Sequence, residues 1–110
     1  MNWRGRMILG LKEETLEKIT GKIARIEKVD QAIIFGSRAK GTQREGSDID
    51  ITLKGDDLDM RDLNQLNLEL EELELPYLID LSIYHHIHDE GLKGHIRRVG
   101  KIIFSRGSHP

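Results

Sequence analysis

One stretch of the chain decides its fold: Ile33-Ile34-Phe35-Gly36-Ser37-Arg38-Ala39-Lys40-Gly41, followed by Ser47-Asp48-Ile49-Asp50-Ile51. The apolar run from Gln31 to Phe35 follows Asp30 and predicts a strand that is buried on both faces. Gly36 ends that strand, one helical turn is expected over 37–40, and Gly41 is a helix stop. The polar residues 42–47 predict a loop, and a second strand is expected over 48–53.

The second strand carries two acids one residue apart. Side chains alternate between the faces of a strand, so Asp48 and Asp50 share a face with Thr52, and Ile49 shares the other with Ile51 and Leu53. Paired carboxylates are suitable ligands for a hard divalent cation such as Mg²⁺. Gly36 and Ser37 stand where backbone amides can hold a phosphate. A phosphate site beside a metal site indicates Mg²⁺–nucleotide chemistry.

The pattern Gly-Ser, ten residues, Asp-x-Asp resembles the signature of the nucleotidyltransferase superfamily that includes DNA polymerase β. In so short a chain the resemblance is greatest to the minimal nucleotidyltransferases (MNT), which occur as the antitoxin half of HEPN/MNT toxin–antitoxin pairs. It extends from about Ala32 to Tyr84 and is carried by Gly36, Ser37, Gly41, Asp48 and Asp50.

The resemblance implies a Mg²⁺-dependent enzyme that transfers AMP from ATP to a protein acceptor, a cognate HEPN toxin that it neutralises. Two Mg²⁺ ions are expected, held by Asp48, Asp50 and a third acid on a later strand. Asp80 is the candidate for that acid, on the face opposite Ile79 and Leu81. It would favour deprotonation of the acceptor hydroxyl.

Two arginines near this motif are candidates for neutralising triphosphate charge. Arg38 follows Ser37 directly, and it could instead hold the turn by pairing with a nearby acid. Arg44 lies in the loop before the acids, where it could fold over the nucleotide. The predicted nucleotide-binding residues are therefore Gly36, Ser37, Arg38 and Arg44.

The remaining elements follow from periodicity and caps. Apolar residues recurring at three- and four-residue steps predict a helix over 11–29, and Asp59 is the expected N-cap of a second helix with a leucine stripe. A third strand is expected over 78–84, a third helix over 89–99 and a last strand over 101–104. The predicted fold class is α/β (α+β), a nucleotidyltransferase-like small mixed sheet of about four strands flanked by helices.

Length and composition narrow the function classes. We expect one domain over residues 1–110, with an irregular lead-in at 1–10 and a disordered tail at 106–110. The chain has no Cys and no apolar run near the ~20 residues of a membrane span, so a cytoplasmic protein is expected. Its net charge of −2 argues against binding of extended nucleic acid. A homo- or hetero-oligomer is compatible with the sequence.

Other interpretations stay open at this point. The chain could be a non-catalytic antitoxin that masks its toxin by contact, or a nucleotidyltransferase for a small molecule such as an aminoglycoside. A cluster of three histidines could bind a transition metal; its members are His85, His86 and His88. Because the chain has no Cys and no second cluster, we favour a polar strand end or an interface as the explanation of these residues.

Overall fold

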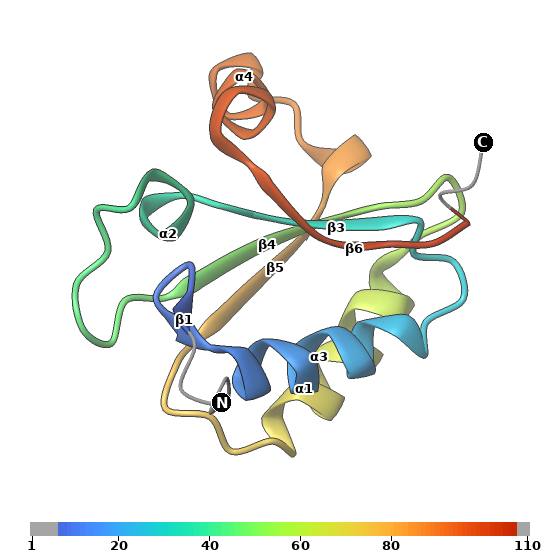
Figure 1. Cartoon of the computed structure of the whole chain (residues 1–110). Coiled ribbons are helices and arrows are strands. Elements are labelled where there is room, and N and C mark those ends of the chain that lie inside the picture. Colours follow the sequence, from blue (N-terminus) through green and yellow to red (C-terminus); the bar gives the residue numbers. More distant parts are fainter. Residues whose placement is uncertain (1–6, 108–110) are drawn as a thin grey trace.

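The computed structural model describes residues 7–107. Its centre is a four-stranded mixed sheet in the order β5-β4-β3-β6 (Figure 1). β3 is antiparallel to both β4 and β6, whereas β4 and β5 are parallel. The strands are β3 (Gln31–Phe35), β4 (Ile49–Lys54), β5 (Ile79–Ile83) and β6 (Lys101–Ser105). The predicted fold class is confirmed, and each strand lies within one residue of its expected bounds.

Helices lie on both faces of this sheet. α1 (Glu13–Ala24) and α3 (Met60–Glu71) lie together on one face, and α4 (Glu90–Val99) lies on the other (Figure 1). The short α2 (Ser37–Lys40) follows β3, and the 3₁₀ turn η2 (Tyr84–His86) follows β5. Within 7–107 no helix combines the length and the apolar character that crossing a membrane requires.

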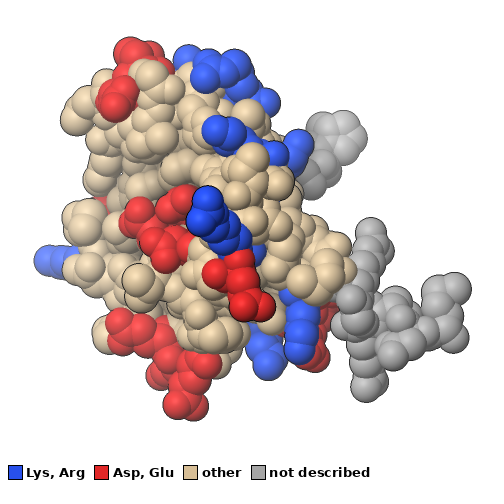
Figure 2. All heavy atoms as spheres, turned by 90° about the vertical axis from the view of Figure 1, so that its left-hand side faces the viewer, with Lys and Arg blue, Asp and Glu red and all other residues tan. Residues whose placement is uncertain are grey.

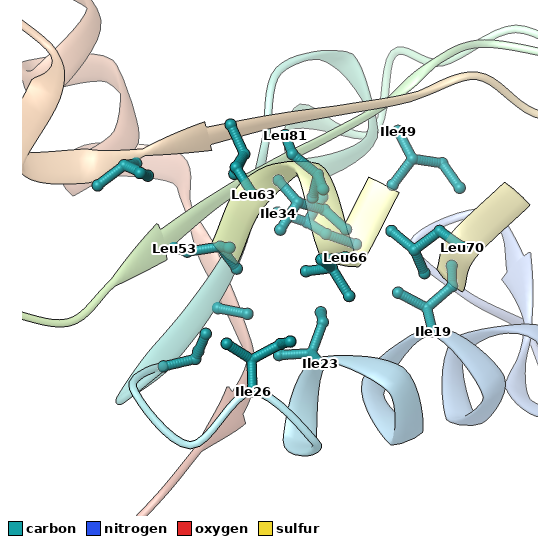
Figure 3. Packing of buried hydrophobic residues seen from close by; sticks show 14 of the residues in the cluster. Ile19, Ile23, Ile26, Ile34, Ile49, Leu53, Leu63, Leu66, Leu70 and Leu81 are labelled. Carbon is teal, nitrogen blue, oxygen red and sulfur yellow. The ribbon is translucent and has the colours of Figure 1, made fainter. Parts of the chain in front are cut away.

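The core fills the space between the sheet and the α1–α3 pair (Figure 3). Ile49, Ile51 and Leu53 of β4 point into it, almost completely buried. Because side chains alternate along a strand, Asp50 and Thr52 then face α4. The helices contribute Ile19, Ile23, Leu63, Leu66 and Leu70 to the same core. The face of the sheet toward α1 and α3 thus carries the apolar core, whereas the polar side chains of β4 lie on the face toward α4.

The N-cap expected at Asp59 is present, and a second helix also has a side-chain cap. Asp59 accepts hydrogen bonds from the amides of Arg61 and Asp62, and the Asp62 carboxylate accepts one from the Asp59 amide. This reciprocal capping box satisfies amides that would otherwise lack partners at the start of α3. Asp89 caps α4 in the same sense through the amide of Leu92, and Gly100 follows its last residue.

The expectation of an irregular lead-in is wrong for residues 7–10. Strands β1 (Met7–Ile8) and β2 (Leu11–Lys12) pair as an antiparallel hairpin. Leu9 and Gly10, its two turn residues, have φ angles of 57° and 77°. Two positive φ angles are characteristic of the tight turn that joins twisted strands. The rest of that expectation, over residues 1–6, lies outside the described residues.

Helix α1 is shorter than periodicity predicts. It begins only after β2 and ends at Ala24, not at Val29. The guanidinium of Arg106 donates hydrogen bonds to the carbonyls of Ala24, Ile26 and Val29, at 2.8, 3.1 and 3.0 Å. These bonds satisfy carbonyls in and beyond the last helical turn. The sequence analysis placed Arg106 in a disordered tail, and these hydrogen bonds show that this expectation is wrong for Arg106. Residues 108–110 of the expected tail lie outside the described part of the chain.

Arg38 connects the hairpin, α2 and the loop before β4. Its side chain is only 3% exposed. It donates to the carbonyls of Leu9 and Gly10 in the hairpin, and to those of Ser47 and Asp48 before β4, over 2.7–3.3 Å. The guanidinium also lies 4.9 Å from the centre of the Tyr77 ring. A planar group with five donors on three nitrogens can serve carbonyls on opposite sides at once, whereas the three donors of Lys all lie on one nitrogen.

We predict that Arg38→Ala lowers the free energy of unfolding by about 3 kcal/mol, because it leaves buried carbonyls without donors. Arg38→Lys should recover only a small part of this loss. The exposed Arg44 is a matched control in the same loop region, and Arg44→Ala should change stability by less than about 0.5 kcal/mol. Urea denaturation followed by circular dichroism measures all three. Equal stability of Arg38→Ala and wild type would contradict the structural role of Arg38.

Candidate active site

The acids of the motif lie at one end of the sheet, on the face toward α4. Asp50 is directly opposite Asp80 in the register of the parallel β4–β5 pair. Adjacent strands are about 4.8 Å apart, so two in-register side chains on one face are immediate neighbours. Asp48 lies just before β4, exposed like Asp80, whereas Asp50 is half-buried. The structure therefore brings the three predicted acids into one neighbourhood.

Their charges act most strongly on Asp50. Burial raises the pKa of its carboxyl above the ordinary value, and the negative charges of Asp80 and Asp48 raise it further. His95, in its protonated form, acts in the opposite direction on the same pKa. Repulsion among carboxylates is relieved when a cation joins them. The site is thus electrostatically prepared for positive charge.

The turn after β3 packs directly against these acids. Gly36 has φ 77° and ψ −151°, a backbone conformation that is accessible essentially to glycine alone. A Cβ at this position would collide with Oδ2 of Asp50. Gly36 is therefore required both by its backbone angles and by its closeness to the carboxylate. Ser37 follows as the first residue of α2 and is half-buried.

The two predicted arginines differ in their surroundings. All of the hydrogen bonds of the Arg38 side chain in the described part of the chain go to backbone carbonyls, as described above. The geometry gives Arg38 a structural role, and we leave it out of the proposed nucleotide site. Arg44 is exposed in the loop that leads to Asp48, and its backbone amide donates to the hydroxyl of Ser47 at 2.8 Å. Within residues 7–107 its side chain forms no hydrogen bond or ion pair, which leaves it able to reach an incoming ligand.

His95 is a site residue that sequence reasoning missed. It comes from α4, and its Nε2 accepts a hydrogen bond from the Gly36 amide at 3.1 Å. Its ring lies edge-on to Phe35, with ring centres 6.2 Å apart and planes at 78°. No signal in the sequence marks it, because a single histidine within a helical pattern has no characteristic spacing.

The donor set suits Mg²⁺, which prefers carboxylate oxygens and usually retains several waters. Among the described residues, no three His, Cys, Asp or Glu side chains converge as a ready-made metal cluster. Mg²⁺ does not need one, since one or two carboxylates together with substrate phosphates suffice in nucleotide enzymes. His85 and His86 are exposed, with their rings edge-on to each other 4.6 Å apart, and they form no such cluster either.

Figure 2 looks onto the end of the sheet where β4 and β5 begin. Acidic atoms gather near the centre of this face, beside a hollow below the upper lobe that contains α4. Basic atoms lie directly next to them. Anionic and cationic groups thus meet at an accessible surface, as a site for a metal–triphosphate complex requires.

The sequence of this chain is similar to that of a curated protein. A curated protein of Methanocaldococcus jannaschii, named as a candidate protein adenylyltransferase, is 44% identical over 61 residues. The match covers 54% of this chain and 64% of that protein. The chain thus spans just under two thirds of its curated relative.

Two solved structures share the fold. A toxin–antitoxin crystallised with AMP-PNP is 26% identical, with a TM-score of 0.60, over 79% of this chain and 73% of that one. The complex of a tri-AMPylated Shewanella oneidensis HEPN toxin with its MNT antitoxin has a TM-score of 0.64 at 21% identity, over 84% and 71% of the two chains.

The family comparison extends over most of the sequence. The model of the family described as polymerase beta, nucleotidyltransferase, matches residues 17–109. This range contains the glycine turn and all three acids, together with the strands that carry them. The chain therefore belongs to the polymerase β nucleotidyltransferase family.

Proposed function

We propose that this chain is a cytoplasmic enzyme that transfers AMP from ATP to a protein, and that the acceptor is a HEPN toxin which it neutralises as the antitoxin. One observation carries the proposal: Asp50 lies in register with Asp80 and directly against Gly36. A phosphate turn in contact with paired acids is the arrangement that nucleotidyl transfer needs, since the triphosphate and its counter-ions must meet.

The reaction assigns a role to each side chain. The acceptor oxygen attacks the α-phosphorus of ATP, the bond between the α-phosphorus and its bridging oxygen breaks, and pyrophosphate leaves. The Gly36 amide and Ser37 would bind phosphate oxygens, and Arg44 would neutralise triphosphate charge. Mg²⁺ ions bound at Asp48, Asp50 and Asp80 would supply charge neutralisation for both the attacking and the leaving oxygen. The exposed Asp80 would favour loss of the proton from the acceptor hydroxyl.

The choice of nucleotide and acceptor is supported by the relatives. The curated relative carries the name of a protein adenylyltransferase, one solved toxin–antitoxin contains an ATP analogue, and another contains an AMPylated toxin. In this chain, Leu68 of α3 and Leu78 before β5 are 65% and 74% exposed. These two side chains are available for contact with a partner, although single exposed apolar residues are common on protein surfaces.

A second function remains in competition: neutralisation of the toxin by contact without any transfer. The structures of toxin–antitoxin complexes among the relatives support it as well, because binding alone can neutralise a partner. The two functions differ in their need for the acids, which masking does not use.

We predict that Asp48→Asn/Asp50→Asn reduces AMP transfer by about 10³-fold or more, because the charges that hold the metal–triphosphate complex are lost. The measurement is the intact mass of a candidate HEPN toxin after its co-expression with each variant. Wild type should add one or more AMP masses.

Asp56→Asn/Asp57→Asn is the matched control, since these are two exposed acids in the turn after the same strand. It should modify the toxin as wild type does. If the toxin co-purifies with wild type and is silenced by it, yet remains unmodified, then the chain acts by masking and not by AMP transfer.

We also predict that Asp50→Asn stabilises the fold, by about 0.5 kcal/mol at neutral pH after allowance for solvent screening. The raised pKa means that folded protein binds the Asp50 proton more tightly than unfolded protein does, so the contribution of Asp50 to stability falls as pH rises above the ordinary value of 3.8. Asn has no such loss. The gain should therefore vanish as pH falls toward that value.

Urea denaturation of both proteins over a series of pH values measures this difference. Asp57→Asn, at an exposed acid in the turn after the same strand, provides the control. A lower stability of Asp50→Asn at neutral pH would show that the carboxylate makes favourable contacts that outweigh repulsion.

A further inference from the structure

The Gly36 amide has a hydrogen-bond partner within the protein. It donates to Nε2 of His95, a residue 59 positions away, at 3.1 Å. An imidazole nitrogen that accepts a hydrogen bond carries no proton there and presents a lone pair. His95 thus offers the amide the same kind of acceptor that a phosphate oxygen would.

His95 reaches the turn from outside the main core. α4 buries Ile96 on the sheet side, and a Cβ at Gly100 would collide with Ile33 of β3. Next to these apolar contacts, His95 places its ring edge against Phe35 and its nitrogen on Gly36. A movement of its side chain would release the amide while leaving the Ile96 contact in place.

The amide cannot serve both acceptors fully. A backbone N–H has one hydrogen to donate, and the lone pair of Nε2 would face the phosphate oxygen that approached the same hydrogen. Repulsion between two acceptors adds to the geometric conflict. A phosphate that binds Gly36 therefore has to displace the imidazole.

We propose that His95 is a positioning residue of the phosphate turn: without nucleotide it occupies the place of a phosphate oxygen on the Gly36 amide, and nucleotide binding displaces it. The proposal rests on the proposed function, because it takes Gly36 as a phosphate ligand. It goes beyond that function because it makes phosphate binding at Gly36 depend on His95, a residue of α4. The imidazole keeps the turn in its unusual backbone conformation against Asp50 and thereby competes with the substrate.

The hydrogen bond can be observed directly. In ¹⁵N-labelled protein, a scalar coupling across the N–H···N bond should join the nitrogens of Gly36 and His95. Saturation with AMP-PNP and Mg²⁺ should abolish this coupling and shift the Gly36 amide signal. Persistence of the coupling in the saturated protein would overturn the displacement of His95 while leaving the proposed function intact.

Affinity provides the second test. His95→Ala removes the competing acceptor and should tighten AMP-PNP binding about fivefold, the population factor that one ordinary hydrogen bond corresponds to. His95→Gln supplies an amide oxygen at similar reach and should stay close to wild type. His86→Ala, an exposed histidine of η2, is the matched control and should bind unchanged.

Isothermal titration calorimetry distinguishes the outcomes. Weaker binding by His95→Ala than by wild type would make His95 part of the nucleotide site and overturn its role as a competitor. Absence of binding by every protein, wild type included, would remove both this proposal and the proposed function. Should His95→Ala fail to fold, the scalar coupling in wild type still decides between the outcomes.

Discussion

The contact between Gly36 and Asp50 is the constraint on which the rest of the site depends. The β3–β4 register places Phe35 opposite Asp50, so that the next residue turns away immediately beside the carboxylate. No side chain fits there, because a Cβ would overlap Oδ2. The turn at Gly36 and the Asp50 carboxylate are consequently one unit, whose relative position follows from the backbone pairing of the central strands. Asp80 joins the unit through the parallel register of β5, again by backbone pairing.

This arrangement divides the sheet into a face that stabilises and a face that functions. Apolar side chains of β4 face α1 and α3, where their burial provides the main driving force for folding. The alternate side chains face α4 and concentrate negative charge, which raises the pKa of Asp50. Carboxylates held close together in the absence of a cation reduce stability, as expected where a fold retains a reactive site. The apolar face therefore has to offset a cost that arises on the opposite side of the same strands.

The sequence contained the elements of this site but not the contacts between them. Strand alternation predicted which face Asp50 and Asp80 occupy, because a period of two depends only on local geometry. The cap of α3 was predictable for the same reason. The hairpin at Met7–Lys12 was not, since two-residue strands are too short to show a period and a positive φ at Leu9 leaves no mark in the sequence. The environments of Arg38 and His95 depend on carbonyls and amides far away in the chain, which no local pattern encodes.

Arg38 and His95 hold the turn region in different ways, and the difference bears on function. Arg38 is almost fully buried and serves carbonyls of the hairpin and of the loop before β4, so releasing it would disrupt the fold. His95 is half-buried and holds a single amide. Under the proposed displacement, Arg38 keeps the turn in place while the Gly36 amide exchanges His95 for a phosphate oxygen. Asp80, meanwhile, is exposed on β5, whose outer edge no strand covers within the described chain. Under the proposed function, the nucleotide is bound against a rigid turn and the acceptor arrives at an open edge, so a small enzyme can act on a protein much larger than its own cleft.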